Sequence, residues 1–158
     1  MIEIKNFISN VQSDNLITFH KSHFDLNKEN CLTHRNTQVI DPPVTNQTEQ
    51  IYNMLTGFIK TINSNLQINY FQIVKWPTGE SQPEHKDFDY HPYTSILYLN
   101  DDFKGGHTFI EGEKIPPKKG SVITFKGELK HGVEEVTEGN RFTISVWYKN
   151  HIGVNKYR

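Results

Sequence analysis

The spacing of apolar residues changes once along this chain, near residue 67, and this change limits the folds that the chain can adopt. In residues 1–66 apolar side chains recur every three to four positions, which is the period of an amphipathic helix. From residue 67 on they alternate with polar side chains, which is the period of a half-buried strand. We therefore expect helices in the first part of the chain and β structure in the second.

Two helices are expected in the first part. Residues 9–22 offer Ser9 and Ser13 as N-caps, followed by an imperfect apolar stripe. Residues 45–65 give a clearer signal, because Thr45 or Thr48 can cap a regular stripe at helical spacing. The stripe consists of Ile51, Leu55, Phe58, Ile59 and Ile62. Such a face needs a partner surface, and we expect it to pack on a sheet.

Short alternating segments follow, separated by turn-forming residues. They read LQINYFQIVKW, YTSILYLN, HTFIEG, GSVITFKG, HGVEEV and RFTISVWYKN. This order predicts an α+β, mainly β fold, a jelly roll braced by the N-terminal helices. Because no repeat or low-complexity linker interrupts the chain, we expect one domain over residues 1–158, with a helical part (1–66) and a β core (67–150). The segment GEKIPPKKG, residues 112–120, is expected to be a mobile rim loop.

Charge and composition disfavour several classes of protein. The formal net charge is -1, and no long run of like charges suggests a nucleic-acid or membrane partner. No apolar run approaches the roughly 18 residues of a spanning helix, and the N-terminus lacks the pattern of a signal peptide. The single cysteine, Cys31, cannot form an internal disulfide. We therefore expect a cytoplasmic protein.

The stretch EHKDFDYHPY, residues 84–93, suggests a metal site. His85 and Asp87 are two positions apart and would share one strand face, so both can point at one ion. Two imidazoles and one carboxylate are typical of non-haem Fe(II) oxygenases, because they leave coordination positions open. A third ligand must come from elsewhere, and His131 in LKHGVEEV is the candidate. We expect His91 to continue the same face toward substrate or water, as does Asp89.

A second pair of the same spacing, His23 and Asp25, has no comparable context, and we expect it at the surface.

The last alternating segment, RFTISVWYKN (residues 141–150), separates an apolar face from a polar face that begins at Arg141. The apolar face holds Phe142, Ile144, Val146 and Tyr148, and the polar face holds Arg141, Thr143, Ser145 and Trp147. A mixed polar face with an arginine is typical of a ligand cavity, and a guanidinium binds a carboxylate bidentately.

Together these segments resemble a known family. HKD, His131 and GNRFTISVW, with SILYLND, GGHTFI and PPKKGSVITF, resemble the catalytic domain of Fe(II)/2-oxoglutarate-dependent dioxygenases, in the prolyl 4-hydroxylase-like branch, over about residues 67–149. The resemblance implies a double-stranded β-helix with His85, Asp87 and His131 as catalytic iron ligands. It also implies that Arg141 and Tyr98 bind the C5 carboxylate of 2-oxoglutarate, with O₂ as cosubstrate and ascorbate as reductant.

The same resemblance leaves the substrate open. It implies that Trp147 borders the substrate, and we expect Trp76 and His91 on the same side of the iron. Trp76 and Gln82 stand where the branch often has tyrosine. The leading expectation is a prolyl residue of a peptide or protein, with a free amino acid or other small molecule as the alternative. A nucleic-acid demethylase is disfavoured, because Trp147 stands where that branch has a second arginine. A non-catalytic metal-binding β-barrel is the alternative outside the enzymes.

Overall fold

The computed structural model describes residues 1–23, 27–28 and 37–151. Asp25 and Cys31, on which two of the expectations rest, lie outside these residues. Within them, no helix is both long enough and apolar enough to cross a membrane.

Two helices form where the apolar periodicity predicts them. Helix α1 spans Asn10–Ser22 and helix α2 spans Asn46–Ile62. Ser9 caps α1 and Thr45 caps α2, each in a reciprocal capping box with the residue three positions on. Both caps were among the candidates from the sequence. The apolar stripe of α1 is imperfect because Val11 is 68% exposed.

The described strands form two larger sheets and a small one. They are β1 (Ile2–Ile4), β2 (Asn27–Lys28), β3 (Gln38–Ile40), β4 (Leu66–Trp76), β5 (Gln82–His85), β6 (Tyr93–Tyr98), β7 (Lys104–Gly105), β8 (Thr108–Ile110), β9 (Glu113–Ile115), β10 (Val122–Lys126), β11 (His131–Val133), β12 (Val136–Glu138) and β13 (Arg141–Asn150). One sheet has the order β1-β10-β6-β13-β4-β3-β2, and the second has the order β5-β11-β8-β9. A short pair, β12-β7, closes one end.

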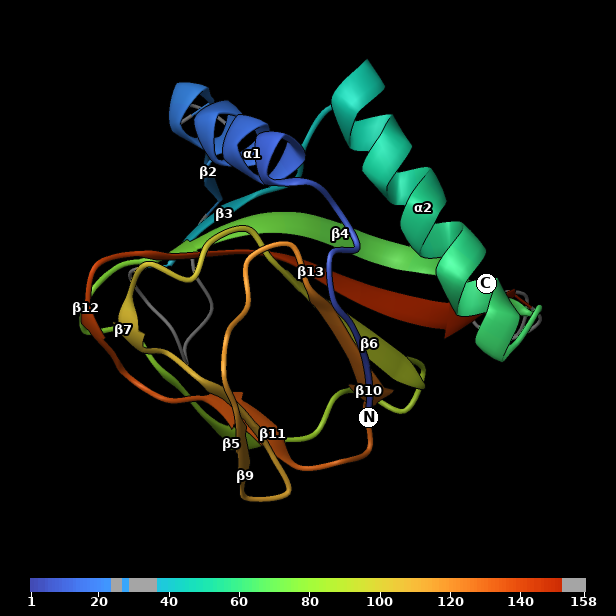
Figure 1. Cartoon of the computed structure of the whole chain (residues 1–158). Coiled ribbons are helices and arrows are strands. Elements are labelled where there is room, and N and C mark those ends of the chain that lie inside the picture. Colours follow the sequence, from blue (N-terminus) through green and yellow to red (C-terminus); the bar gives the residue numbers. More distant parts are fainter. Residues whose placement is uncertain (24–26, 29–36, 152–158) are drawn as a thin grey trace.

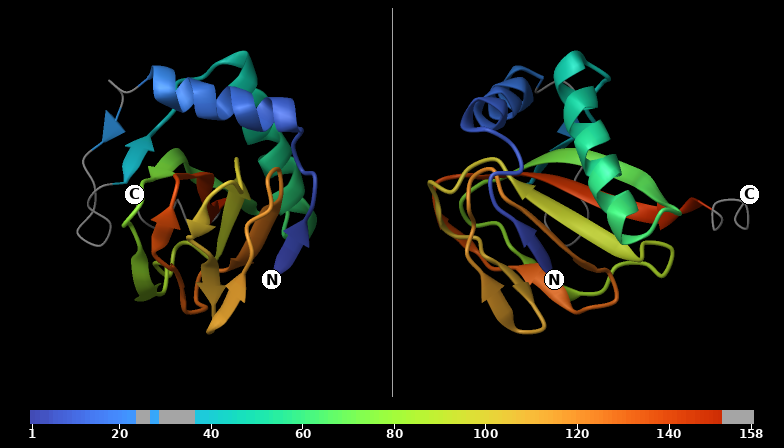
Figure 2. Two further views of the ribbon diagram at one scale, coloured as in Figure 1. Left: turned by 60° about the vertical axis from the view of Figure 1, so that its left-hand side comes forward. Right: turned by 45° about the vertical axis from the view of Figure 1, so that its right-hand side comes forward.

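Both helices cover one face of the larger sheet, and the smaller sheet faces its other side (Figure 1). In both views of Figure 2 the helices stay on that one side of the molecule, so neither of the two described helices covers the smaller sheet. The core beneath the helices joins their buried side chains to one face of β13. Its members include Ile51, Leu55, Ile59, Phe142, Ile144, Val146 and Tyr148. The structure therefore confirms the mainly β jelly roll and the apolar face assigned to the last segment.

Between the two sheets lies the other face of β13 and β6. Ile96, Tyr98, Ile110, Ile115, Ile123 and Phe125 form one apolar cluster there, and Val39, Val74, Trp76, Val133 and Val136 form another. Tyr98 and Trp76 are thus buried inside the barrel, on the inner face of the larger sheet. These two apolar clusters fill part of the barrel interior, and polar side chains lie between them.

Several short strands lie where the sequence did not predict them. β1 pairs with β10 and β3 pairs with β4, although both belong to the part expected to be helical. β9 falls inside residues 112–120, which were expected to form a loop, and it pairs with β8. Strands of three residues carry too little alternation to be recognised, and pairing with distant segments creates them.

Candidate active site

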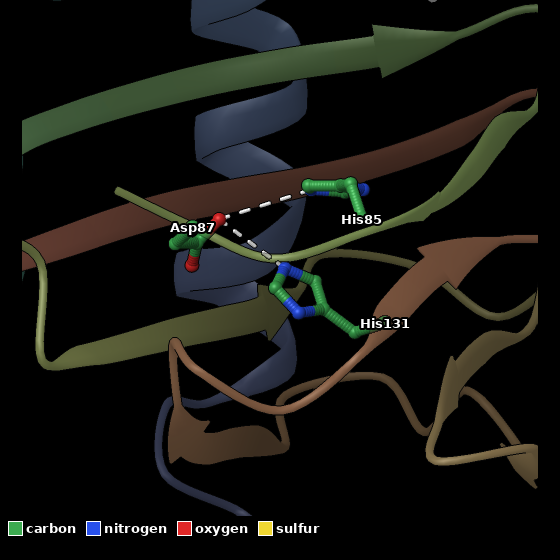
Figure 3. A group of neighbouring side chains, drawn as sticks. All are labelled: His85, Asp87 and His131. Atoms are coloured by element: carbon green, nitrogen blue, oxygen red, sulfur yellow. Dashed lines mark ion pairs between the residues drawn. The ribbon is translucent and has the colours of Figure 1, made fainter. Parts of the chain in front are cut away.

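Three predicted ligands meet inside the barrel. His85 ends β5 and His131 begins β11, and the two residues are direct partners in the antiparallel register. Such partners have Cβ atoms about 4.5–5.5 Å apart, and the two ring centroids are 4.4 Å apart. Asp87 follows β5, with its Oδ1 3.2 Å from Nε2 of His131 and 3.8 Å from Nε2 of His85 (Figure 3). All three ligand atoms lie within 4.8 Å of one another.

Neighbouring groups orient each of these ligands. Nδ1 of His85 donates to the Pro83 carbonyl oxygen at 2.9 Å, and Nδ1 of His131 donates to the Leu129 carbonyl oxygen at 2.7 Å. Because a carbonyl can only accept, the proton of each neutral ring sits on Nδ1 and Nε2 keeps its lone pair. The Thr94 hydroxyl donates to Oδ2 of Asp87, which leaves Oδ1 facing the rings. This donor set fits a divalent ion such as Fe(II).

Burial and charge keep the cluster ready for a cation. The side chains of Asp87 and His131 are 6% exposed, and that of His85 is 32% exposed. Burial would raise the pKa of Asp87, but hydrogen bonds from His131 and Thr94 outweigh it and lower that pKa. Burial would lower the pKa of His131, but its hydrogen bond to Asp87 raises it overall. The lowered pKa keeps the Asp87 carboxylate ionised, and its negative charge favours a cation beside it.

The backbone of Gly127 forms a hydrogen bond with the segment that holds Asp87. The Asp87 amide donates to the Gly127 carbonyl at 2.9 Å, and the Gly127 amide donates to the Pro92 carbonyl at 3.0 Å. A Cβ atom at position 127 would lie 2.4 Å from the His91 carbonyl oxygen and 3.0 Å from the Cβ of Asp87. The chain can therefore bring Asp87 to the two rings only with a residue that lacks a side chain at position 127.

Replacing Gly127 by alanine should displace Asp87. We expect it to cost about 1–3 kcal/mol in the free energy of unfolding, as overpacking in a close contact does, and to weaken metal binding. Gly57→Ala is the control, because nothing lies within 4 Å of a Cβ at this helical position and alanine there should stabilise slightly. Thermal unfolding and metal titration of both variants check this. Equal stability and metal affinity in the two variants would contradict it.

An open cavity of about 460 Å³ lies over His85 and Asp87. Its lining consists of Tyr70, Gln72, Gln82, His85, Lys86, Asp87, Phe88, Tyr90, His91 and Trp147. The volume is in the range of small-ligand sites. The structure thus brings Trp147 and His91, two of the predicted substrate contacts, to the same cavity as the metal cluster.

His91 reaches the cavity by a different path from the one predicted. β5 ends at His85, and the chain then turns, with the His91 amide donating to the Phe88 carbonyl at 2.8 Å. His91 is 4% exposed, and its Nε2 lies 2.7 Å from Nδ2 of Asn69. The expectation of one strand face running from His85 through His91 is therefore wrong. The turn follows from the need to place Asp87 against Gly127.

Exposed aromatic side chains surround the cavity, and sequence reasoning missed them. Tyr70 is 51% exposed, Phe88 68% and Tyr90 44%. The rings of Phe88 and Tyr90 stack at a centroid distance of 5.3 Å, and Tyr70 meets Trp147 edge to face at 6.4 Å. Apolar groups that stay exposed around a cavity mark a binding surface. Tyr70 is in phase with Gln72, Val74 and Trp76 along β4, and this signal could have indicated it, whereas Phe88 and Tyr90 lie in a turn that carries no such signal.

Deeper in the barrel, Arg141 is a buried cation. It is 1% exposed, and it donates through Nε to the Gly106 carbonyl at 3.0 Å and through a terminal nitrogen to the Thr108 hydroxyl at 3.1 Å. The Tyr98 hydroxyl lies 2.6 Å from the same Thr108 oxygen. Among the described residues, no carboxylate forms an ion pair with Arg141, and the buried Thr143 hydroxyl has no hydrogen-bond partner. Such a site calls for an anion, and a carboxylate of 2-oxoglutarate fits it.

Trp76 lies beside this arginine rather than beside the metal cluster. It is 5% exposed, it is the direct strand partner of Arg141, and its ring centroid is 5.2 Å from the guanidinium carbon. It does not line the cavity above Asp87. The structure thus places Trp76 beside Arg141 and outside this cavity, because its ring packs on the guanidinium, and the expected substrate contact stays a prediction.

The chain was compared with known proteins. The model of a family described as the 2OG-Fe(II) oxygenase superfamily matches residues 71–149. Mouse prolyl 3-hydroxylase 3 is 38% identical over 80 residues, which are 45% of this chain and 11% of that protein. Rat prolyl 3-hydroxylase 1 is 25% identical over 138 residues, 65% of this chain and 19% of that protein. The chain thus spans only about a tenth to a fifth of the length of these curated relatives.

Solved structures share the fold at lower identity. A viral collagen prolyl hydroxylase from Paramecium bursaria Chlorella virus-1, in complex with 2-oxoglutarate, has a TM-score of 0.76 at 20% identity over 94% of both chains. A Pseudomonas putida prolyl-4-hydroxylase has a TM-score of 0.79 at 17% identity over 94% of this chain and 91% of that one. A Trichoplax adhaerens prolyl hydroxylase in complex with a hypoxia-inducible factor peptide fragment has a TM-score of 0.79 at 16% identity, covering 99% of this chain and 86% of that one.

Proposed function

Because the chain belongs to the 2OG-Fe(II) oxygenase superfamily, we propose that it is an Fe(II)- and 2-oxoglutarate-dependent hydroxylase that acts on a prolyl residue of a peptide or protein. One observation carries the proposal. The cluster of His85, Asp87 and His131 lies under an open cavity with an aromatic rim, and the same barrel holds a buried arginine without an ion-pair partner among the described residues. A barrel that only binds a metal ion does not require such a buried arginine.

Each described residue then has a role. His85, Asp87 and His131 would hold Fe(II), which when bound supplies the redox chemistry with O₂. Arg141 binds the distal carboxylate of 2-oxoglutarate, and Tyr98 donates a hydrogen bond to the same group. Overall, 2-oxoglutarate, O₂ and a substrate C–H group give succinate, CO₂ and an alcohol. Ascorbate would serve as the reductant that keeps the iron in its ferrous state.

In this reaction the protein orients the cosubstrate and excludes water from the site. The hydroxyl of Thr108 joins Arg141 and Tyr98 into one hydrogen-bonded unit, so the guanidinium does not have to reorganise when the cosubstrate binds. The buried hydroxyl of Thr143, which has no hydrogen-bond partner among the described residues, lies on the same face of β13 and supplies a further hydrogen bond to the cosubstrate. The apolar cluster of Ile96, Phe125 and their neighbours excludes water between the sheets.

The aromatic rim supports a prolyl substrate. Grooves lined with aromatic rings dock proline, because the ring stacks on them and the preformed extended conformation loses little entropy. Two aromatic pairs line the cavity: Tyr70 and Trp147 meet edge to face, and Phe88 and Tyr90 stack. The curated relatives described above are named as prolyl 3-hydroxylases, and one of the solved structures is named as a prolyl-4-hydroxylase.

A direct assay tests this function. Purified protein is incubated with Fe(II), ascorbate, 2-oxoglutarate and a library of proline-containing peptides, with free L-proline and other amino acids in parallel. We expect peptides that gain the mass of one oxygen atom while succinate forms. The Asp87→Ala variant is the control for adventitious iron chemistry. Oxygenated free amino acid without oxygenated peptide would overturn the peptide assignment in favour of the small-molecule alternative.

Trp147 and Trp76 should separate substrate contacts from cosubstrate contacts. Trp147→Ala should lower substrate-coupled hydroxylation by about tenfold or more, since an aromatic contact of this size contributes more than 1.4 kcal/mol, with little effect on binding of 2-oxoglutarate. Trp76→Ala should instead raise the KM for 2-oxoglutarate, because it removes the support of Arg141. Tyr52→Ala, on the exposed face of α2, is the control. If both tryptophan variants changed only the KM for 2-oxoglutarate, the side of the iron assigned to Trp147 would be wrong.

A further inference from the structure

Two glutamines line the cavity from opposite sheets. Gln72 comes from β4 in the larger sheet, and Gln82 comes from β5 in the smaller one. The other lining side chains are aromatic rings, histidines, Lys86 and the ligand Asp87. The two glutamines are thus the side chains of this cavity that offer an NH₂ donor and a carbonyl acceptor in one planar amide group.

A β-bulge turns Gln82 into the cavity. Gln82 and His85 are three positions apart and would face opposite sides of a regular strand. In the register with β11, however, His85 pairs with His131 and Gln82 pairs with Val133, so three steps on β5 match two on β11. The extra residue lets both side chains line the same cavity, which is what bulges near active sites do. No hydrogen bond joins the Gln82 side chain to another of the described residues, so its amide is available.

Gln72 is fixed by an acidic neighbour. Its Nε2 donates to Oδ1 of Asp41 at 2.9 Å. Because a carboxylate only accepts, this contact decides which end of the amide is the nitrogen. The Gln72 oxygen and the second N–H then remain for a ligand. Asp41 directly follows β3, whose last residue Ile40 pairs with Ile73 of β4, so the strand pairing holds Asp41 next to Gln72.

In the part of the chain that the structure describes, the backbone beside these glutamines is also open. β13 is the only described strand that pairs with β4 over residues 66–72, because β3 covers only residues 73–75. β5 is an outer strand of the smaller sheet. The cavity therefore lies between two strand edges, and an extended segment can enter between them.

These groups suit a peptide better than a free amino acid. A side-chain amide pairs with a peptide bond through one donor and one acceptor. A free amino acid needs a carboxylate for its ammonium group, and the only carboxylate lining this cavity in the described part of the chain is Asp87, which faces the two histidines. The cavity thus has matching groups for a peptide main chain and lacks them for a charged amine.

We propose that Gln72 and Gln82 bind the main-chain amides on either side of the target residue and so select a residue within a peptide over the free amino acid. The inference rests on the proposed function and extends it to the substrate's main chain. Asp41 is a positioning residue, which acts on the peptide through Gln72.

Leucine variants test the pair, because leucine keeps the size of glutamine without its hydrogen bonds. The probe is a peptide of alternating glycine and proline, acetylated and amidated at its ends, titrated into protein loaded with Zn(II) and 2-oxoglutarate. We expect Gln72→Leu and Gln82→Leu each to weaken the peptide by about three- to tenfold, which is about 0.7–1.4 kcal/mol, with unchanged 2-oxoglutarate affinity. Gln67→Leu, on the same strand but outside the cavity lining, should bind as the unaltered protein does.

Asp41→Ala separates positioning from direct contact. It should weaken the peptide in the unaltered background and have no further effect in the Gln72→Leu background, since the two changes remove the same interaction. Additive losses in that double variant would contradict the role of Asp41 as a support for Gln72.

The outcomes separate this inference from the proposed function. Weaker peptide binding in both leucine variants, without an oxygenated product from any substrate, would support the glutamine pair and overturn the hydroxylase. An oxygenated peptide that binds equally to the leucine variants and to Gln67→Leu would overturn the pair and leave the hydroxylase standing. Free L-proline bound as tightly as the blocked peptide, or no binding of the peptide at all, would overturn the pair as well.

Discussion

Asp87→Ala is expected to abolish 2-oxoglutarate turnover and to weaken metal binding by more than about a hundredfold. Loss of a group that only supports a metal ligand costs about 10- to 100-fold, and Asp87 is the one carboxylate in the cluster. Its removal also takes away the negative charge that draws the cation to two neutral rings. The fold should persist, because Asp87 contributes no apolar surface to the core clusters. Calorimetric metal titration, succinate formation and circular dichroism measure the three effects.

Asp89→Ala is the matched control for this variant. Asp89 lies two residues further on, is exposed, and is not part of the cluster. It should bind metal and turn over 2-oxoglutarate as the unaltered protein does. Wild-type turnover by Asp87→Ala, without an added small carboxylate to replace the lost ligand, would refute the assignment of the metal site.

Arg141→Gln is expected to weaken 2-oxoglutarate by about tenfold to a few hundredfold. A charge-assisted hydrogen bond contributes about 1.5–3 kcal/mol, and each 1.4 kcal/mol is about tenfold in affinity. Glutamine keeps part of the side-chain volume, but it has no positive charge and cannot bind a carboxylate bidentately as a guanidinium does. Metal affinity should change little, because Arg141 does not belong to the cluster. Tyr98→Phe should give a smaller loss, since it removes one neutral hydrogen bond. Calorimetry with Zn(II) in place of Fe(II) measures all three.

An analogue that lacks the distal carboxylate provides the control for Arg141. 2-Oxopentanoate keeps the 2-oxo acid group, so Arg141→Gln should not weaken its binding. The preference of the protein for 2-oxoglutarate over 2-oxopentanoate should therefore nearly vanish in the variant. Stability without ligand should not fall, because the change removes a buried charge that has no ion-pair partner among the described residues. An unchanged preference would show that a group other than Arg141 binds the distal carboxylate, and would contradict the role assigned to Arg141.

Much of this site was visible in the sequence because alternation in strands is a strong signal. The period of two along residues 141–150 placed Arg141 and Trp147 on the face opposite Phe142 and Ile144, and the structure has them there. The spacing of His85 and Asp87 predicted a shared ion, and the register with His131 brings the third ligand beside them. Each of these groups lies on or next to a regular strand, so residue chemistry and spacing made them candidates, and the resemblance to a known family selected them.

Other features depend on contacts that no local pattern reveals. His91 follows a turn that exists because Gly127 accepts the close approach of Asp87 and of the His91 carbonyl. Gln82 faces the cavity only through a bulge, and Trp76 packs on Arg141 through a strand pairing between residues far apart in the chain. In each case tertiary pairing overrides the alternation read from one segment, which is why strand signals depend on context.

Tracing the two atoms of O₂ tests the central claim most directly. The protein is incubated with Fe(II), 2-oxoglutarate, ascorbate, ¹⁸O₂ and a peptide substrate from the library. We expect one heavy oxygen atom in succinate and one in the hydroxylated prolyl residue, in equal amounts, with neither product formed by Asp87→Ala. A hydroxyl oxygen that came from water, or succinate formation that the peptide does not increase, would contradict a 2-oxoglutarate-dependent prolyl hydroxylase.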